Sequence, residues 1–179
     1  MALLDLSGLW GWLAGVGALG VAGSLLQLVW KGVSARIERG RRLLEEARPE
    51  LKPRGSLGTH GTVQLELENN GKDVARNALL GFTGVTVVAE CRELWPGKGP
   101  VATNALDITG SRFFNPADDG PWNAIVTYAD RYENPYKMLV PVDRDPRNDG
   151  SFNTRIRRNQ YRNEAPKLGR WALYKLGGR

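Results

Sequence analysis

Cysteine and histidine are almost absent from the 179-residue sequence, since each occurs only once. The single cysteine, Cys91, cannot form an intramolecular disulfide, and one cysteine with one histidine, His60, cannot complete a zinc site without carboxylates. Asn-x-Ser/Thr sequons are missing as well, so nothing marks a glycosylated surface. These absences predict neither a disulfide framework nor a metal site, and a reducing compartment suffices for such a chain.

Catalytic signatures are also missing. A catalytic triad would need His60, and no G-x-S-x-G elbow accompanies it. Gly15–Gly20 has the G-x-G-x-x-G spacing of a dinucleotide-binding loop, but these glycines lie inside one apolar segment rather than between a strand and a helix. The acidic segment Asp143–Gly150 resembles a calcium loop, yet Arg147 takes a ligand position. We therefore predict no catalytic residue, no cofactor and no metal, and we expect a protein that is not an enzyme.

Charge is missing from one long run, Leu6–Trp30. As a helix, a run of this length would measure about 37 Å, more than the ~30 Å hydrocarbon core of a bilayer. The run predicts an N-terminal transmembrane α-helix, with the lipid bilayer as a partner. Tryptophans near its two ends are predicted to lie at the membrane interface: Trp10, Trp12 and Trp30.

Small side chains recur at four-residue spacing within this run. One row is Ser7, Gly11 and Gly15, and another is Ala14, Ala18 and Ala22. Such rows allow two helices to approach closely in lipid. They predict helix pairing and a homodimer formed through the transmembrane helix. The alternative is that small residues are simply frequent in helices of this kind.

Basic residues follow the run at once, while none precedes it. This asymmetry predicts a single-pass protein with its N-terminus outside and the rest of the chain in the cytoplasm. The helix is expected to continue beyond the membrane as far as Pro49, which cannot extend it. The arginines of this connector are candidates for contact with anionic lipid, the alternative being a solvated stalk: Arg36, Arg39, Arg41 and Arg42.

From about Leu51 the hydrophobic period changes from helical to two. Val63, Leu65 and Leu67 alternate with polar residues, and Asn69-Asn70-Gly71 then supplies turn residues. Trp122–Ala129 and Tyr136–Val142 form the clearest hairpin, and Pro141 predicts a free edge because it lacks a ladder donor. Six or seven short strands indicate one all-β, antiparallel sandwich. The predicted core aromatics are Trp95, Phe113, Trp122 and Tyr128.

The chain therefore divides into four predicted parts. They are a transmembrane anchor (1–30), a charged helical connector (31–50), a β-sandwich domain (51–143) and a partly disordered basic aromatic tail (144–179). Charge is distributed unevenly over them, since residues 55–150 carry nine basic and thirteen acidic side chains while residues 151–179 carry eight basic and one acidic. The acidic domain thus lies between two basic segments.

Several motifs resemble a known family. Asn69-Asn70-Gly71 with Ala75, then Leu94-Trp95-Pro96-Gly97, then Ile125-Val126-Thr127-Tyr128, is similar to the N-x-G…A…L-x-P-G…V-x-Y rhythm of bacterial immunoglobulin-like sandwiches, including CARDB-type adhesion modules. The chain also resembles small bacterial single-span membrane proteins. The resemblance implies an immunoglobulin-like β-sandwich after one transmembrane helix, and it implies structure more than activity.

The tail interleaves basic and aromatic residues. Basic groups attract phosphates, and aromatic rings stack on bases or lie among lipid headgroups. The tail is therefore predicted to bind anionic lipid, with nucleic acid and a plain solubilising tail as alternatives; its candidates are Arg155, Arg157, Arg158, Arg162, Arg170 and Lys175. If Arg170–Leu176 forms a short helix, its apolar residues could enter the headgroup region of a membrane while Lys175 remains solvated.

Together these patterns predict a membrane-anchored, non-enzymatic interaction or scaffold module. Its β-sandwich would bind a protein partner through an edge or a loop, and its basic segments would contact anionic lipid. One alternative is a membrane-tethered nucleic-acid-binding protein that uses the basic tail. Another is an envelope adhesion module, if the topology is inverted.

Overall fold

The computed structural model describes residues 7–56, 61–146 and 152–178, and within helix α1 it describes side chains from Gly23 onward. The chain forms two compact units. Unit 1 combines residues up to Leu43 with residues from Leu168 onward, and unit 2 comprises Leu44–Lys167.

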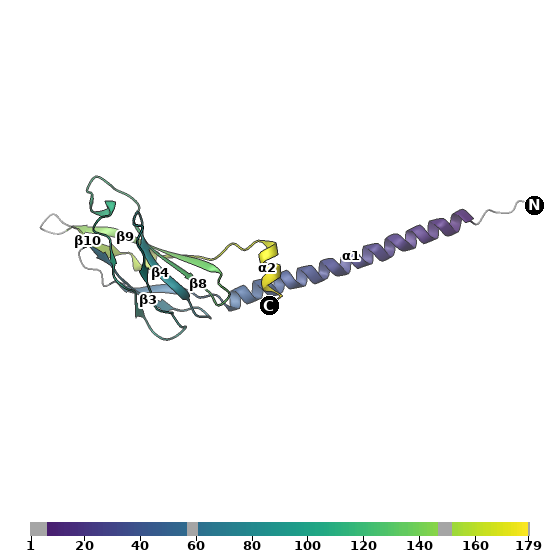
Figure 1. The fold of residues 1–179 in the computed structure, drawn as a ribbon, viewed down its shortest axis with the longest axis horizontal. Helices are drawn as coiled ribbons and strands as arrows, with labels where there is room; N and C mark the ends of the chain where they lie inside the picture. Colours follow the sequence, from purple (N-terminus) through teal and green to yellow (C-terminus); the bar gives the residue numbers. More distant parts are fainter. Residues whose placement is uncertain (1–6, 57–60, 147–151, 179) are drawn as a thin grey trace, which may run out of the picture. The chain divides into compact units, whose positions relative to one another are not determined.

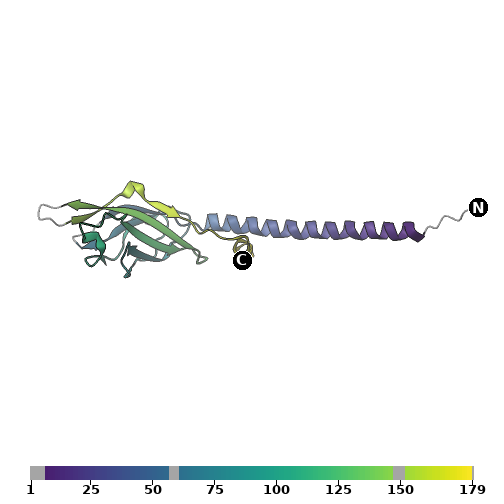
Figure 2. The ribbon, with the colours of Figure 1, turned by 90° about the horizontal axis from the view of Figure 1, so that it is seen from above.

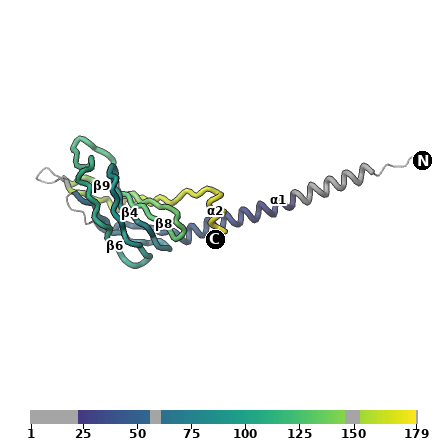
Figure 3. The backbone as a smooth tube through the Cα atoms, viewed as in Figure 1, coloured from purple at the N-terminus to yellow at the C-terminus, as the bar shows by residue number. Residues whose placement is uncertain are grey.

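Helix α1 (Ser7–Glu46) is one uninterrupted helix of 40 residues (Figure 1). It ends shortly before Pro49, as the sequence predicts, because proline cannot donate to the helical ladder. Unit 1 also contains α2 (Arg170–Leu176), so this segment does form a short helix. The backbone trace shows α2 lying beside α1 (Figure 3).

The prediction of a transmembrane anchor is contradicted. In the part of the chain that the structure describes, no helix combines the length and the apolar character needed to cross a membrane. The predicted single-pass localisation, with the N-terminus outside and the sandwich in the cytoplasm, depends on that anchor and is corrected with it.

Unit 2 consists mostly of antiparallel strands, together with two short 3-10 helices. The strands are β1 (Leu51–Ser56), β2 (Thr62–Val63), β3 (Leu65–Asn69), β4 (Arg76–Phe82), β5 (Ala89–Glu90), β6 (Val101–Ala102), β7 (Leu106–Asp107), β8 (Asn123–Ala129), β9 (Pro135–Pro146), β10 (Phe152–Ile156) and β11 (Arg162–Glu164). The 3-10 helices are η1 (Arg112–Phe114) and η2 (Arg158–Gln160).

The strands form three sheets. A six-stranded sheet has the order β10-β9-β8-β4-β5, with β11 also paired to β9; a second sheet has the order β1-β3-β6; and β2 pairs with β7. The large sheet curls across the unit (Figures 1 and 2). The β-rich antiparallel character predicted for this region is confirmed, whereas the fold class as a whole is corrected because it includes the transmembrane helix.

The period-two patterns explain the core. Val63, Leu65 and Leu67 are fully buried while the residues between them are half-exposed, as strand alternation requires. Phe113 and Tyr128 are also buried, which confirms two of the predicted core aromatics. Trp95 is 46% exposed, so its assignment to the core is wrong. Trp122, half-buried, packs against the core by stacking on Phe82 and meeting Phe113 edge-on.

The predicted turn after β3 depends on the buried side chain of Asn69. Its amide nitrogen donates to the carbonyls of Asp73 and Leu94, and its amide oxygen accepts from the backbone N–H groups of Glu50 and Gly71. Four backbone groups are thereby satisfied by one side chain in the interior. This residue holds the start of the sheet, the turn and the β5–β6 connection together.

Arg144, on β9, holds the long segment between β7 and β8. Its guanidinium donates to the carbonyls of Phe113, Asn115 and Asp118 at 2.6–2.7 Å, and it lies over the rings of Phe113 and Trp122. The segment has little regular structure of its own beyond η1. One cation therefore satisfies backbone carbonyls that no strand partner satisfies.

Pro141 lies in the middle of β9, so the prediction that it marks a free edge is wrong. Val142 donates to Trp122 on the β8 side, and the Pro141 carbonyl accepts from Arg157 on the other side. The N–H and C=O groups of one residue point to the same side of a strand, and consecutive residues alternate between the two sides. An N–H group at position 141 would therefore also point toward Arg157. At that point the segment that pairs with β9 leaves it, because β10 ends at Ile156 and pairing resumes with β11 at Arg162. The missing donor thus falls in a break in the ladder.

The free edge of β1 is covered by side chains from the same segment. The Asn163 side chain donates to the carbonyl of Leu51, and Arg158 donates to the carbonyl of Arg54. These bonds join the small sheet to the segment that follows β10. The two sheets are therefore connected along one side by side-chain-to-backbone hydrogen bonds rather than by a strand ladder.

Candidate functional site: a groove between α1 and α2

Unit 1 contains a groove of about 720 Å³ between α1 and α2. Its lining residues on α1 recur at helical spacing and so share one face of that helix. They are Trp30, Val33, Ser34, Ile37, Glu38 and Arg41, and α2 contributes Arg170, Trp171 and Tyr174. The lining is largely apolar and aromatic, and its charged members, Glu38, Arg41 and Arg170, are exposed.

Two glycines allow α2 to approach α1 closely. A Cβ atom at Gly40 would lie 2.0 Å from the carbonyl oxygen of Leu173, and one at Gly177 would lie 2.0 Å from that of Arg36. Leu173 and Leu176 are buried in this contact. Because both obstructing atoms belong to the backbone, only glycine fits at either position.

A ladder of rings and cations runs along one side of the groove. The Arg36 guanidinium lies 4.5 Å from the centroid of the Tyr174 ring, and it also donates to the Tyr174 hydroxyl. Tyr174 stacks on Trp171 at 5.6 Å, and the Lys175 ammonium lies 5.4 Å from the Trp171 ring. Such contacts orient the two rings and keep positive charge beside them.

Both tryptophans of the groove are left uncovered. Trp30 is 64% exposed and Trp171 is 67% exposed. Leu26, one turn before Trp30 on the same face of α1, is also 71% exposed and extends the apolar surface along the helix. Contiguous apolar surface of this kind is uncommon on a protein that has no partner.

The structure brings together some of the sequence-predicted site residues. Trp30, Arg41 and Arg170 line the groove, whereas Arg39 and Arg42 are exposed outside its lining. The side chains of the remaining interface and helix-pairing candidates lie outside those described: Trp10, Trp12, Ser7, Gly11, Gly15, Ala14, Ala18 and Ala22. Their pairing stays a prediction. Sequence reasoning did not place Ile37, Trp171 or Tyr174 in one site, because their contact depends on two helices far apart in the chain.

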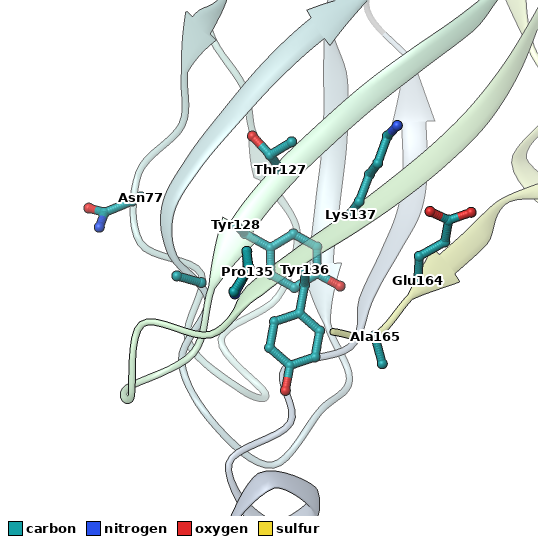
Figure 4. A pocket seen from close by; sticks show the side chains of 9 residues that line it. Asn77, Thr127, Tyr128, Pro135, Tyr136, Lys137, Glu164 and Ala165 are labelled. Atoms are coloured by element: carbon teal, nitrogen blue, oxygen red, sulfur yellow. The ribbon is translucent and has the colours of Figure 1, made fainter. Parts of the chain in front are cut away.

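Unit 2 has a pocket of about 460 Å³ at one end of β8 and β9 (Figure 4). Tyr128 and Tyr136 stack there at 5.5 Å, and Tyr136 donates to the buried Asp130. Burial raises the pKa of Tyr128 to about 12, and burial with the nearby Asp130 carboxylate raises the pKa of Tyr136 still further. Both hydroxyls stay protonated at neutral pH. That of Tyr136 donates to Asp130 in the β8–β9 turn, and that of Tyr128 donates to the Asn163 side chain on β11.

Arginines gather where the chain bulges away from β9. Arg155, Arg157 and Arg158, with Asp143, Asn159 and Gln160, line a hollow of about 650 Å³ that we term the arginine cluster. Arg162, predicted with them, lies beyond this hollow on β11, 3.7 Å from Glu164.

Metal and nucleophile candidates are few. Among the described residues no group of three or more His, Cys, Asp or Glu side chains could hold a metal ion. Cys91 is a half-buried free thiol, and burial raises its pKa to about 11, so it is a thiol rather than a thiolate at neutral pH. His60 lies outside the described residues.

Searches against protein-family models, curated proteins and solved structures found no match to this chain. The resemblance to bacterial immunoglobulin-like sandwiches therefore stays a prediction.

Proposed function

We propose that this protein is a binding module without catalytic activity, and that the groove between α1 and α2 receives an amphipathic, acidic helix of a protein partner. The single observation that carries the proposal is the pair of exposed tryptophans, Trp30 and Trp171, on the walls of one apolar groove. Tryptophan is among the residues that most often dominate the energy of a protein interface. The proposal keeps the predicted protein partner and moves its binding surface from the β-sandwich to the helical unit.

The shape of the groove favours a helix. Trp30, Val33 and Ile37 lie along one face of α1, and Trp171 and Tyr174 face them from one side of α2. A third helix that places a hydrophobic stripe between these two would bury both tryptophans, as in other helix-in-groove complexes. An extended peptide would lack a sheet edge to pair with in this unit, whose described elements are helices.

The charge of the surroundings favours an acidic partner. Residues 30–43 and 170–178 hold seven basic side chains and one acidic side chain, Glu38. Arg41, which lies 3.7 Å from Glu38, and Arg170 are exposed members of the groove lining. Carboxylates that flank the hydrophobic stripe of a partner helix would approach these arginines, which speeds association and excludes basic partners.

The test uses the full-length chain and two labelled synthetic helical peptides with the same leucine stripe. One peptide carries glutamates beside the stripe and the other carries lysines at the same positions. Fluorescence anisotropy should show binding of the acidic peptide only. Trp171→Ala should weaken that binding at least about tenfold, because the substitution truncates a central aromatic anchor.

Trp95 supplies the matched control. It is also an exposed tryptophan, but it belongs to unit 2, so Trp95→Ala should leave the affinity for the acidic peptide unchanged. Arg170→Glu should lower the affinity for the acidic peptide and raise the affinity for the lysine peptide. Equal affinity of the two peptides, or equal effects of Trp171→Ala and Trp95→Ala, would contradict the proposal.

A further inference from the structure

We propose that the arginine cluster of unit 2 is a binding site for a phosphate monoester group, the dianion found on phosphorylated side chains, on phosphorylated metabolites and at nucleic-acid ends. The proposal is independent of the groove on unit 1. The cluster lies where the chain leaves β9 between β10 and β11, beside Pro141.

The segment between β10 and β11 places several donors around one hollow. Five residues, 157–161, lie between the last pair of β10 with β9 and the first pair of β11 with β9, and η2 forms within them. The residues that line the hollow of about 650 Å³ are Asp143, Arg155, Ile156, Arg157, Arg158, Asn159 and Gln160. Guanidinium and amide N–H groups are the donors that planar or tetrahedral oxyanions accept from.

Two of the three arginines are held in place by the protein. The Arg157 Nε donates to Asp143 at 2.5 Å, and its Nη1 donates to the Gln160 side chain at 3.1 Å. The Arg158 Nη1 donates to the carbonyl of Arg54 at 2.9 Å. Each guanidinium has five N–H groups, so donors remain for a ligand after these bonds are made. Fixed side chains lose less conformational entropy when a ligand binds.

The charge of the lining matches one phosphate group. Arg155, Arg157 and Arg158 contribute three positive charges, and Asp143 is the one acidic residue in the lining. Asp143 lies opposite Arg155 in the strand register, but its carboxylate bonds Arg157. Among the described residues Arg155 has no salt-bridge partner. A net charge of +2 on the lining corresponds to the charge of ≈ −1.5 to −2 that a phosphate monoester carries at neutral pH.

The composition of the lining also favours a phosphate monoester over a nucleic-acid strand as the ligand. Binding of single strands usually combines phosphate contacts with aromatic side chains on which bases stack. The residues that line this hollow include no aromatic side chain. A terminal phosphate fits such a site better than a stacked strand does.

The test measures binding of four probes to the full-length protein at neutral pH by calorimetry. They are inorganic phosphate, a blocked phosphoserine, and one short oligonucleotide with and without a 5′-phosphate. The expected result is binding of the three probes that carry a phosphate monoester or phosphate itself, and no binding of the oligonucleotide that ends in a hydroxyl. The three arms distinguish a free phosphate, a phosphorylated side chain and a nucleic-acid end as sources of the group.

Variants link any binding to the cluster. Arg155→Gln should weaken phosphoserine binding about tenfold, because it removes one charge-assisted donor. Arg157→Lys keeps the charge but loses the planar fork, so it should also weaken binding. Arg92→Gln, an exposed arginine elsewhere in unit 2, should have no effect.

Two results would overturn the proposal. One is the absence of binding by every phosphate-bearing probe. The other is equal binding of the two oligonucleotides with a steep loss of affinity as salt rises, because that behaviour defines non-specific attraction of a polyanion to basic surface.

Discussion

Replacing Gly40 by alanine should detach α2 from α1 and leave unit 2 intact. The new Cβ would lie 2.0 Å from the Leu173 carbonyl oxygen and 2.8 Å from its carbon, and Cβ atoms essentially never approach closer than 3.0 Å. The two helices must therefore separate by at least about 1 Å. Both obstructing atoms are backbone, so no rotamer change removes the clash.

The magnitude follows from what holds α2. Leu173 and Leu176 are 6% and 5% exposed, and burying two leucines stabilises the docked helix by about 3–6 kcal/mol as an upper bound. A helix of seven residues is unstable alone in water, so it forms only while docked. If separation removes about 3 kcal/mol of this packing, the amide hydrogens of α2 should exchange about 100-fold faster.

Hydrogen exchange followed by mass spectrometry measures this directly, with the Gly177 amide, which donates to the Leu173 carbonyl, as the clearest reporter. Gly32→Ala is the matched control, because a Cβ there meets nothing within 4 Å and alanine should stabilise α1 by about 0.5–1 kcal/mol. The acidic peptide should also bind Gly40→Ala weakly, although Gly40 is not part of the groove lining. Unchanged protection of α2 in Gly40→Ala, or the same loss in Gly32→Ala, would refute this reasoning.

Three further predictions concern unit 2. Asn69→Ala should destabilise unit 2 by about 3 kcal/mol in urea unfolding, because four backbone groups lose a hydrogen-bond partner. Asn70 is exposed, so Asn70→Ala should change the stability little, and equal effects of the two substitutions would contradict the role of Asn69. Arg144→Met should cost about 2 kcal/mol and raise proteolysis between β7 and β8, and an unchanged cleavage rate would show that the segment is held by other contacts. Folding raises the pKa of Tyr128 from 10.0 to about 12, so the unfolded chain releases this proton first and the free energy of unfolding should fall as pH rises from 10 to 12. Tyr128→Phe should reduce this fall. An identical pH profile of the free energy of unfolding in the variant would contradict the role of Tyr128.

The strands with strong alternation were predictable because burial on one face dictates a period of two. Leu65 and Leu67 illustrate this in β3, and the β8–β9 hairpin follows the predicted segments closely. The prediction that Trp95 belongs to the core was wrong because hydrophobicity alone does not determine burial. The Trp95 ring is half-exposed beneath the Lys98 ammonium. The prediction that Pro141 marks a free edge was wrong because a central strand tolerates a missing N–H donor where its neighbouring strand is interrupted.

The groove could be predicted only in part. Val33 and Ile37 already lie near one helical face in the sequence, and Trp171 and Tyr174 already lie close together in the tail. Nothing in a periodic pattern relates Gly40 to Gly177, because their contact joins segments at opposite ends of the chain. Long apolar runs are equally ambiguous, since length and lack of charge indicated a transmembrane anchor that the described helix does not support.

The hydrogen bonds that cover the edge of β1 affect how the protein behaves when it is concentrated. Exposed strand edges recruit strands from other molecules, and this is a common beginning of aggregation. Here two carbonyls of β1 already accept from Asn163 and Arg158, and the edge strands β5 and β6 are only two residues long. Substitutions that free the β1 edge should therefore appear first as slow, concentration-dependent assembly of otherwise folded molecules, before any loss of thermal stability is detected.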